Sequence, residues 1–517
     1  MKKIFLLLAT LCLLWTPNLR AQDCPDSLES MPILKGGRVK PLFTHAKEII
    51  KFITGKSGIA DLSATQVYCQ LSLEATAPQK ISQKIRIIVP HIKTREFLEL
   101  PAHQDNINFK QAKKHLEEAL KTAPTLESRE DASAFSKDLK AFVVRVQLLD
   151  EIINGENWVV PNFSEDNNLS WIPVKTEWEN WHNAPPTKAE NFSQHLNGIA
   201  DNFSNLQGNH YLLELKYEKL QLIQWAILAV LTCLGLGLLF RRHDRPAVMV
   251  CLIGVFIIEI TAITLRVMIS GRGPVTNMYE TVMWVGFGGL FFATILAFIR
   301  REILFLSVGL TLNLACLFMM TFATDMLDPA IKPLVPVLRD NFWLSTHVTT
   351  ITISYAAFAL SWILSDYYMV KTMFFKPLPT ETLYINNLCY DCLKIGVVLL
   401  ALGIILGGIW ADYSWGRFWG WDPKETWALA ALLIYIAILH GRFSGWIKAE
   451  WFIPFTGLAF LGIIMAWFGV NYILAAGLHS YGFSEGGRLF ILLLAAVQVV
   501  VFAIYVLRIR KSKSPAC

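Results

Sequence analysis

Five tryptophans crowd one short stretch between two long apolar segments of the chain. They are Trp410, Trp415, Trp419, Trp421 and Trp427. Tryptophans also populate the interfacial belts of membrane proteins, but a belt spreads them over many helix ends. Here Gly416 and Gly420 interrupt the cluster, and glycine lets a backbone approach a ligand closely. The composition of this loop therefore favours a surface for a planar apolar ligand.

Three of the eleven histidines lie in or beside the later apolar segments: His347, His440 and His479. Imidazole is a common axial ligand of haem iron, and two imidazoles on opposite faces make a six-coordinate site. His347 and His479 lie at segment ends that the charge pattern places on the same side as the tryptophans. A single interfacial histidine is ordinarily just hydrogen-bonded. Two beside an aromatic loop favour a haem held between them, with the five tryptophans as its platform.

His440 has a different setting from the other two histidines. It lies some 14 residues into its apolar segment, roughly 20 Å below the outer surface at the rise of a helix. An ionisable side chain at this depth is a functional candidate. Glu259 and Arg266 are also intramembrane, and their seven-residue spacing puts them on one helix face, where we expect them to pair.

The acidic residues of the tryptophan stretch admit two interpretations. Asp422-Pro-Lys-Glu425 has the order of a helix start, with a capping Asp, a first-turn Pro and a Glu three residues after the cap. The alternative is a general acid and base pair. The spacing favours the cap, so Asp422 and Glu425 are expected to set the angle at which the chain leaves the loop and enters the next helix.

Composition divides the chain of 517 residues into a polar first part and an apolar second part. The whole is 54% hydrophobic and 17% charged, and the long apolar runs lie after residue 220. A membrane-spanning helix needs about 20 apolar residues. Nine such segments are predicted: 221–240, 247–270, 281–299, 303–324, 347–364, 393–411, 426–445, 451–474 and 488–507. The expected fold class is a polytopic α-helical membrane protein with a soluble, mixed and mostly helical exported domain in front.

Basic residues of alternate loops predict the topology. They are Arg241 to Arg245, Arg300 with Arg301, Lys371 with Lys376, Arg442 with Lys448, and the tail 508–517. All belong on the cytoplasmic side by the positive-inside rule. Residues 1–21 are typical of a secretory signal peptide, with an uncleaved anchor as the alternative because Leu19 is less typical of a cleavage site. Either one puts a domain of residues 22–215 outside. The two arguments agree on a multi-pass protein of the bacterial inner membrane, with the tryptophan loop outside the cytoplasm.

The N-terminal domain offers fewer functional signals. Residues 36–42 are predicted to form a turn that leads into a helix over 45–53, and residues 110–153 have helical periodicity. Cys24 and Cys69 are the two cysteines expected in the exported domain and can form one disulfide. Cys389 and Cys392 are interpreted as incidental thiols in a cytoplasmic loop. No basic aromatic patch suggests a nucleic-acid partner.

The tryptophan stretch resembles the WWD signature of the haem-handling proteins of cytochrome c biogenesis. The stretch is Trp415-Gly-Arg-Phe-Trp-Gly-Trp-Asp-Pro-Lys-Glu-Thr-Trp427. Residues 220–510 resemble the CcsA (ResC) subunit of the System II cytochrome c synthase. The segments that support the resemblance are 271–280, 347–357 and 470–482.

The resemblance implies roles for the matching residues. His347 and His479 would be the external axial ligands of haem b, and His440 the intramembrane histidine that receives haem first. The implied partners are a separate CcsB (ResB) membrane subunit, an apocytochrome c with a Cys-x-x-Cys-His motif, and an extracytoplasmic thiol-reducing protein. In the implied reaction the cysteine thiols add to the haem vinyl groups, and no residue of this chain serves as nucleophile or acid–base catalyst.

Two other functions stay open at the level of sequence. The WWD loop also occurs in proteins that hold or export haem and leave its ligation to a partner. A transporter that uses the aromatic loop for a quinone or a sugar is the other alternative. Co-expression with a reporter apocytochrome separates ligation from export, and a haem absorption band separates both from a non-haem transporter.

Overall fold

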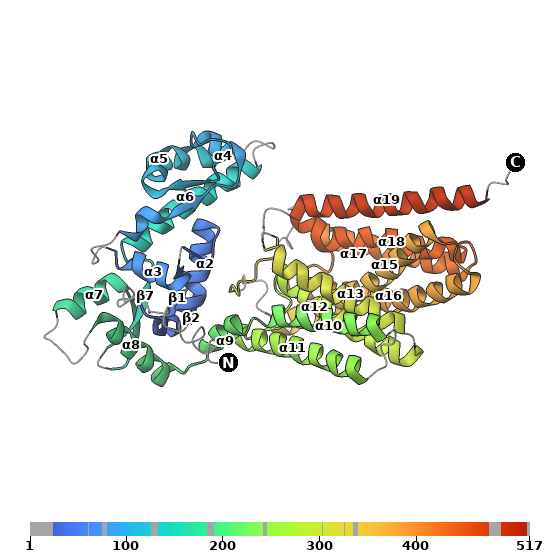
Figure 1. Ribbon diagram of the computed structural model, residues 1–517, viewed down its shortest axis with the longest axis horizontal. Coiled ribbons are helices and arrows are strands. Elements are labelled where there is room, and N and C mark those ends of the chain that lie inside the picture. Colours follow the sequence, from blue (N-terminus) through green and yellow to red (C-terminus); the bar gives the residue numbers. More distant parts are fainter. Residues whose placement is uncertain are drawn as a thin grey trace, which may run out of the picture. The chain divides into compact units, whose positions relative to one another are not determined.

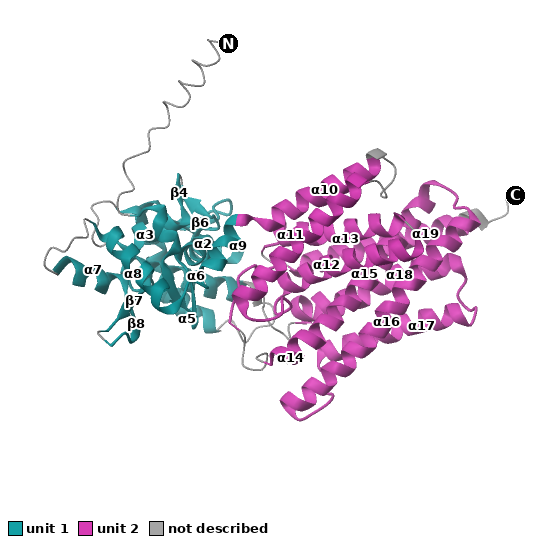
Figure 2. Cartoon of the chain, turned by 90° about the horizontal axis from the view of Figure 1, so that it is seen from below, with its two compact units in different colours: residues 1–219 teal, residues 220–517 magenta. Residues whose placement is uncertain are grey.

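The computed structural model describes residues 24–59, 61–74, 80–125, 133–164, 166–183, 191–240, 246–301, 303–324, 326–333, 340–474 and 487–513. Figure 2 shows the two compact units into which the chain divides, residues 1–219 and residues 220–517. The predicted signal peptide and the predicted ligand His479 both lie outside the described residues.

Unit 1 is a small helical domain with four two-stranded antiparallel sheets. Its helical elements are η1 (Asp26–Ser30), α2 (Leu42–Thr54), α3 (Ala64–Ser72), η2 (Ile81–Lys84), α4 (Ile92–Phe97), α5 (Phe109–Thr125), α6 (Ser133–Ile153), α7 (Val174–Asn183), α8 (Phe192–Gln207) and α9 (Leu212–Leu220). Its hairpins are β1–β2 (Pro32–Lys35, Arg38–Pro41), β3–β4 (Gly58–Ile59, Leu62–Ser63), β5–β6 (Arg86–Ile88, Asn106–Asn108) and β7–β8 (Val159–Phe163, Leu169–Pro173).

The predicted turn at residues 36–42 is present, and it closes the hairpin β1–β2. Gly36 and Gly37 have φ of 61° and 76°, which a residue with a side chain rarely adopts. The predicted helix follows as α2, while the periodic segment 110–153 is divided between α5 and α6. Cys24 and Cys69, both buried, form the predicted disulfide, which joins α3 to the residues before η1.

Unit 2 is a bundle of long apolar helices. They are α10 (Leu222–Phe240), α11 (Pro246–Ser270), α12 (Met278–Arg300), α13 (Ile303–Phe322), α14 (Asn341–Trp343), η5 (Leu344–Val348), α15 (Thr349–Phe374), α16 (Pro379–Trp415), α17 (Pro423–Phe443), α18 (Ala449–Ile464), η6 (Met465–Leu474) and α19 (Gly487–Lys513). Counting consecutive helices as one span, the described residues contain nine helices long and apolar enough to cross a membrane. The predicted number and order of spans are therefore confirmed (Figure 1).

Helix α15 lies at the centre of this bundle and packs against α12, α16, α18 and α19. Its buried positions alternate large residues such as Phe358 with small ones such as Ala356 and Ser361. Small residues let helices approach closely where water provides no driving force for their association. Large aliphatic side chains of α10, α11 and α19 remain exposed on the outside, as expected of surfaces that contact lipid.

The sixth span differs from its predicted bounds. Helix α16 begins at Pro379, well before the apolar run at 393, with a proline at its first position, and its buried residues begin at Ile385 and include the polar Asn386 and Asp391. Cys389 and Cys392 therefore lie inside a helix, buried in the core, and the predicted loop around them was wrong. Neither thiol is in a disulfide, and Cys389 donates to the carbonyl of Ser361.

Candidate functional site

His347 lies on a π-helical turn, η5, between the short helix α14 and the long helix α15. Asp340 starts this segment, because its Oδ1 accepts hydrogen bonds from the backbone N–H groups of Phe342 (3.0 Å) and Trp343 (3.1 Å). A π turn inserts one residue into a helix and so changes which way the following side chains point, and such turns are frequent at functional sites. Here the turn packs the His347 side chain against α16.

The His347 ring is held by the backbone of α16. Its Nδ1 donates to the carbonyl of Gly403 over 2.8 Å, which fixes the proton on that nitrogen, because a carbonyl oxygen only accepts. The coordinating lone pair is then on Nε2. Histidine ligands of metals ordinarily have this arrangement, with the other ring nitrogen donating to a carbonyl or a carboxylate.

Glycines of α16 make the space that the ring occupies. A Cβ atom added to Gly407 would lie 2.5 Å from Cε1 of His347 and 3.2 Å from its Nε2. Gly403 and Gly407 are four residues apart, so they lie on one face of the helix. At the next residue, a Cβ on Gly408 would lie 2.5 Å from the ring of Phe418, which the tryptophan loop contributes.

Trp410 supports His347 from the interior. Its side chain is buried, packs with Leu344, Trp343 and Val348, and has its ring centroid 5.8 Å from that of His347 at an angle of 60°. Because Trp410 is buried, it packs against His347 from the interior and offers no exposed surface for a ligand. Only other tryptophans of the cluster can provide such a surface.

Two of the remaining tryptophans form the tip of the loop between α16 and α17. The rings of Trp419 and Trp421 meet edge to face, with centroids 5.9 Å apart and planes at 88°. Trp421 is 71% exposed and has a φ of 56°, a left-handed conformation that residues with a side chain rarely adopt. Strain of this kind is common at ligand-binding sites, where surrounding contacts enforce it.

Trp415 and Trp427 flank this tip on the two helices. Trp415 is half-buried at the last residue of α16. Trp427 lines an apolar groove of about 460 Å³ between α17 and the helices α18 and η6, together with residues such as Phe455 and Met465. The five tryptophans therefore occupy four environments: a buried support (Trp410), the half-buried end of α16 (Trp415), the loop tip (Trp419 and Trp421) and a groove (Trp427).

The glycines of the loop have local structural roles. Gly416 ends α16 in the left-handed conformation, with φ of 67°, and its N–H donates to the carbonyl of Asp412 over 2.8 Å. Gly420 lies beneath the guanidinium of Arg417, since an added Cβ would lie 2.3 Å from one of its nitrogens. Within the loop, Arg417 therefore packs over Gly420, while Phe418 packs over Gly408 of α16.

The predicted helix cap at Asp422 and Glu425 is confirmed. Oδ1 of Asp422 accepts from the N–H of Lys424 over 3.0 Å, and Oε2 of Glu425 accepts from the N–H groups of Asp422 (3.1 Å) and Gly420 (2.8 Å). The reciprocal bonds make a capping box at the start of α17. Because Glu425 also binds Gly420, the cap holds the tryptophan tip in place.

His440 lies at the opposite end of α17 from the loop. It follows Pro423 by 17 residues (440 − 423), which corresponds to about 26 Å along a helix. Its side chain is exposed, and its ring meets that of Trp446 edge to face at 5.8 Å. The structure thus brings His347 together with the tryptophan loop and keeps His440 apart from both.

The helix η6, which precedes His479 in the chain, is also π-helical. Residues of η6 are anchored to other segments of unit 2: Nε1 of Trp467 donates to Oγ1 of Thr281 (3.1 Å), and the hydroxyl of Tyr472 donates to the carbonyl of Met326 (2.6 Å). His347 therefore lies on one π-helical stretch, and the second stretch, η6, is held by hydrogen bonds from Trp467 and Tyr472.

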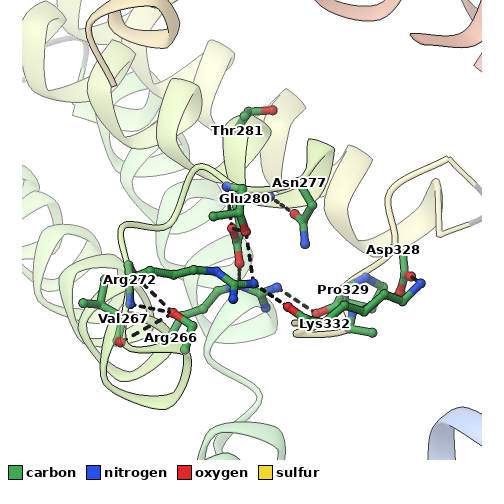
Figure 3. Close-up of polar contacts among 12 residues, drawn as sticks. Arg266, Val267, Arg272, Asn277, Glu280, Thr281, Asp328, Pro329 and Lys332 are labelled. Atoms are coloured by element: carbon green, nitrogen blue, oxygen red, sulfur yellow. Dashed lines mark hydrogen bonds and ion pairs between the residues drawn. The ribbon is translucent and has the colours of Figure 1, made fainter. Parts of the chain in front are cut away.

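A buried ion pair organises the same end of α11 and α12. Figure 3 shows Arg266 and Glu280 pointing toward each other, with Nε of Arg266 donating to Oε1 of Glu280 over 2.8 Å. Both side chains are 1% exposed. Arg266 also donates to the carbonyl of Pro329 (2.9 Å), so the pair ties the segment before His347 to these two helices.

The expected pairing of Glu259 with Arg266 was wrong. Glu259 instead accepts a hydrogen bond from Nδ2 of Asn313 on α13 over 2.7 Å, while Arg266 reaches the next helix. Spacing along one helix showed that both residues share a face. The nearer partners came from other helices, which no pattern within a single segment reveals.

The glycines beneath the site were missed by sequence reasoning. Gly396, Gly403 and Gly407 recur along α16 at helical spacing, and each lies under a side chain of α15 or η5. That recurrence in an apolar segment was the available signal of close helix packing.

Comparison with known proteins identifies the family. Residues 275–479 match the family described as cytochrome C assembly protein. NrfI of Wolinella succinogenes is 29% identical over 492 residues, which cover 86% of this chain and 53% of NrfI. This chain thus spans about half the length of NrfI, and the match exceeds the 298 residues of unit 2 (517 − 219), so it reaches into unit 1.

Shorter relatives match the membrane unit. The cytochrome c biogenesis protein CcsA of Guillardia theta is 33% identical over 287 residues, which cover 48% of this chain and 90% of that protein. CcsA of Prochlorococcus marinus (strain MIT 9301) is 31% identical over 317 residues, which cover 54% of this chain and 99% of that protein. The chain belongs to the CcsA family of cytochrome c biogenesis proteins.

Proposed function

We propose that this chain binds haem b, holds it at the tryptophan loop through His347 and His479, and supports its covalent attachment to an apocytochrome c. A role in cytochrome c assembly follows from the family. The observation that supports the haem-binding step most directly is the setting of His347. Its Nδ1 is hydrogen-bonded to Gly403 and its ring fits against Gly407, within reach of the tryptophan loop.

The residues fit haem by their chemistry. The hydrogen bond at Nδ1 sets the tautomer in which Nε2 coordinates iron, and it raises the basicity of that ligand. Exposed Trp421 and the ring of Trp419 offer apolar surface to a flat macrocycle. Haem, as the substrate of this reaction, supplies the vinyl groups to which thiols add, and this chain supplies binding and orientation.

His440 is proposed as the residue that first contacts haem, on the cytoplasmic half of the membrane. It is exposed on unit 2, at the end of α17 where Arg442 and Lys448 follow. An exposed imidazole on a spanning helix is costly against lipid and needs a polar or coordinating partner. A CcsB-type membrane subunit is the partner proposed to cover this surface.

The cap at Asp422 and Glu425 is proposed to position the loop and to take no part in proton transfer. Both carboxylates are already used as acceptors of backbone N–H groups. The haem-bound loop is proposed to lie outside the cytoplasm, since the basic residues gather at the opposite ends of the spans.

Co-expression tests the ligation step of the proposal. The chain is produced with a CcsB-type partner and a reporter apocytochrome c that carries Cys-x-x-Cys-His. Covalent haem, detected as haem staining of the reporter after denaturing electrophoresis, is expected with the wild-type chain and lost with His347→Ala. Haem bound to the complex without any covalent product would contradict ligation and support a haem exporter or chaperone.

A further inference from the structure

A basic pocket of about 900 Å³ lies at the end of unit 2 where α15 and α19 end and α16 and α18 begin. Lys376, Lys448 and Arg508 line it, one from each of three different segments. The volume is in the range of small-molecule sites. The charge pattern predicts this end of the bundle to be the cytoplasmic one, opposite the tryptophan loop.

The pocket carries a net positive charge. Within the described part of the chain, the side chains of Lys376, Lys448 and Arg508 form no ion pair, whereas the neighbouring Lys371 is paired with Glu381. The half-buried Glu450 also lines the pocket, so the charge is three cations minus one carboxylate, or +2.

Two helices begin at the pocket and add to its attraction for anions. Pro379 is the first residue of α16 and Ala449 the first of α18. Their N-cap residues, Leu378 and Lys448, provide no side-chain hydrogen bond to the helix starts. The N-terminal end of a helix carries a partial positive charge and uncapped N–H groups, which favours a bound anion.

Exposed apolar side chains line the pocket or neighbour its lining residues in the chain, and together they are called its apolar rim. Leu383 lines the pocket and is 57% exposed. Phe374, Phe375 and Leu378 neighbour the lining residues Lys376, Pro377 and Pro379 in sequence and have exposed fractions of 72%, 65% and 65%. Leu507 of α19, 65% exposed, precedes the pocket residue Arg508. A soluble anion needs no apolar rim, whereas a phospholipid presents a phosphate and acyl chains together.

We propose that this pocket binds the phosphate headgroup of an anionic phospholipid. Lys376, Lys448 and Arg508 surround the phosphate, the starts of α16 and α18 point at it, and the acyl chains lie along the apolar rim. The site is at headgroup depth because it is at the ends of spanning helices. Basic pockets between such helices suit anionic headgroups.

Native mass spectrometry of the full-length chain in detergent tests this. The chain is titrated with phosphatidylglycerol, with phosphatidylcholine of the same acyl chains, and with glycerol 3-phosphate. Saturable binding of phosphatidylglycerol is expected to exceed that of phosphatidylcholine, and the soluble phosphate is expected to bind far more weakly than the lipid. Equal binding of the two lipids, or equal binding of the lipid and the soluble phosphate, would overturn the proposal.

Matched variants localise the binding. Lys448→Gln/Arg508→Gln is expected to weaken phosphatidylglycerol binding about 25-fold, or about fivefold for each cation. The control Arg301→Gln/Arg510→Gln removes two exposed cations that lie outside the pocket, on the side where the charge pattern also places the pocket. It is expected to change the affinity for phosphatidylglycerol less than twofold. Lys448→Arg should retain binding of phosphatidylglycerol.

Equal losses of lipid affinity in both double variants would contradict a specific pocket, as would displacement of the lipid by haemin alone. The test needs no haem-dependent activity, so its result is independent of the proposed function.

Discussion

At the scale of single residues, the site depends on the fit between one histidine and the glycines beneath it. His347 can lie flat on α16 only because Gly407 has no side chain, and its hydrogen bond to Gly403 then sets the ring orientation. The residues that hold the ring of the predicted ligand His347 therefore lie on a different helix, α16.

Replacing Gly407 by alanine is therefore expected to weaken haem binding. The new Cβ would lie 2.5 Å from Cε1 of His347, so the ring must leave its hydrogen bond. Disturbing such an outer contact of a metal ligand costs about 10–100-fold in affinity. Haem titration by absorbance measures the change.

The matched control for this variant is Gly254→Ala on α11, where an added Cβ meets no atom within 4 Å. It is expected to leave haem affinity unchanged. Equal haem affinities of Gly407→Ala and the wild type would mean that the position of His347 against α16 is not needed for haem binding.

The other residue-scale prediction concerns His45 in unit 1. His45 is buried, and its Nε2 lies 3.2 Å from the hydroxyl of Tyr68 and 3.3 Å from Oδ1 of Asn157. Burial, aided by the nearby Lys40, lowers the pKa of His45 from 6.5 to about 3. Between pH 6.5 and 3 the unfolded state therefore binds the additional proton, and the stability of unit 1 falls as the pH falls.

The expected loss is at most about 1.4 kcal/mol per pH unit below 6.5. Hydrogen exchange of the α2 amides in the full-length protein, corrected for the intrinsic rate, measures it. His45→Gln should remove most of this slope. A slope that persists in His45→Gln would assign the pH dependence to other groups.

At the scale of elements, several helices of unit 2 are joined by buried polar contacts near the end that holds the tryptophan loop. Arg266 and Glu280 connect α11, α12 and the segment at Pro329 (Figure 3). Trp467 connects η6 to Thr281 of α12, and Tyr472 connects it to Met326. These contacts hold η6 and the residues at Met326 and Pro329 against the rest of unit 2.

Breaking the ion pair on one side is expected to destabilise unit 2. Arg266→Met leaves the Glu280 carboxylate buried without its cation, and such losses typically cost about 3–5 kcal/mol. The melting temperature of the detergent-solubilised protein should fall. The double variant Arg266→Met/Glu280→Met removes both charges and should recover a large part of the loss. A double variant less stable than Arg266→Met would contradict a role limited to charge compensation.

The elements also show what a sequence can predict. Nine spans and the cap at Asp422 follow from periodicity and local spacing, which act within one segment, and both were confirmed. The start of α16, the partners of Glu259 and Arg266, and the seat of His347 depend on contacts between helices. These contacts bring together residues distant in the chain, so reading each segment by itself could not find them.

At the scale of the whole molecule, unit 2 has two chemically different ends. One end holds His347, the tryptophan loop and the hydrogen-bonded Tyr472 of η6. The other holds His440 and the basic pocket. In the proposed transfer of haem, the end with His440 receives haem and the end with His347 presents it. The proposed lipid site would hold the His440 end at the membrane surface.

The most direct test of the central claim is the absorption spectrum of the purified chain with its membrane partner. Wild type is compared with His347→Ala, His479→Ala and His440→Ala, and with His210→Ala as a control in an exposed part of unit 1. The account predicts a haem spectrum of a six-coordinate, bis-imidazole site that His347→Ala and His479→Ala lose or shift and that added imidazole restores. His210→Ala should match the wild type. A haem spectrum unchanged in both His347→Ala and His479→Ala, or no haem band in the wild-type complex, would contradict it.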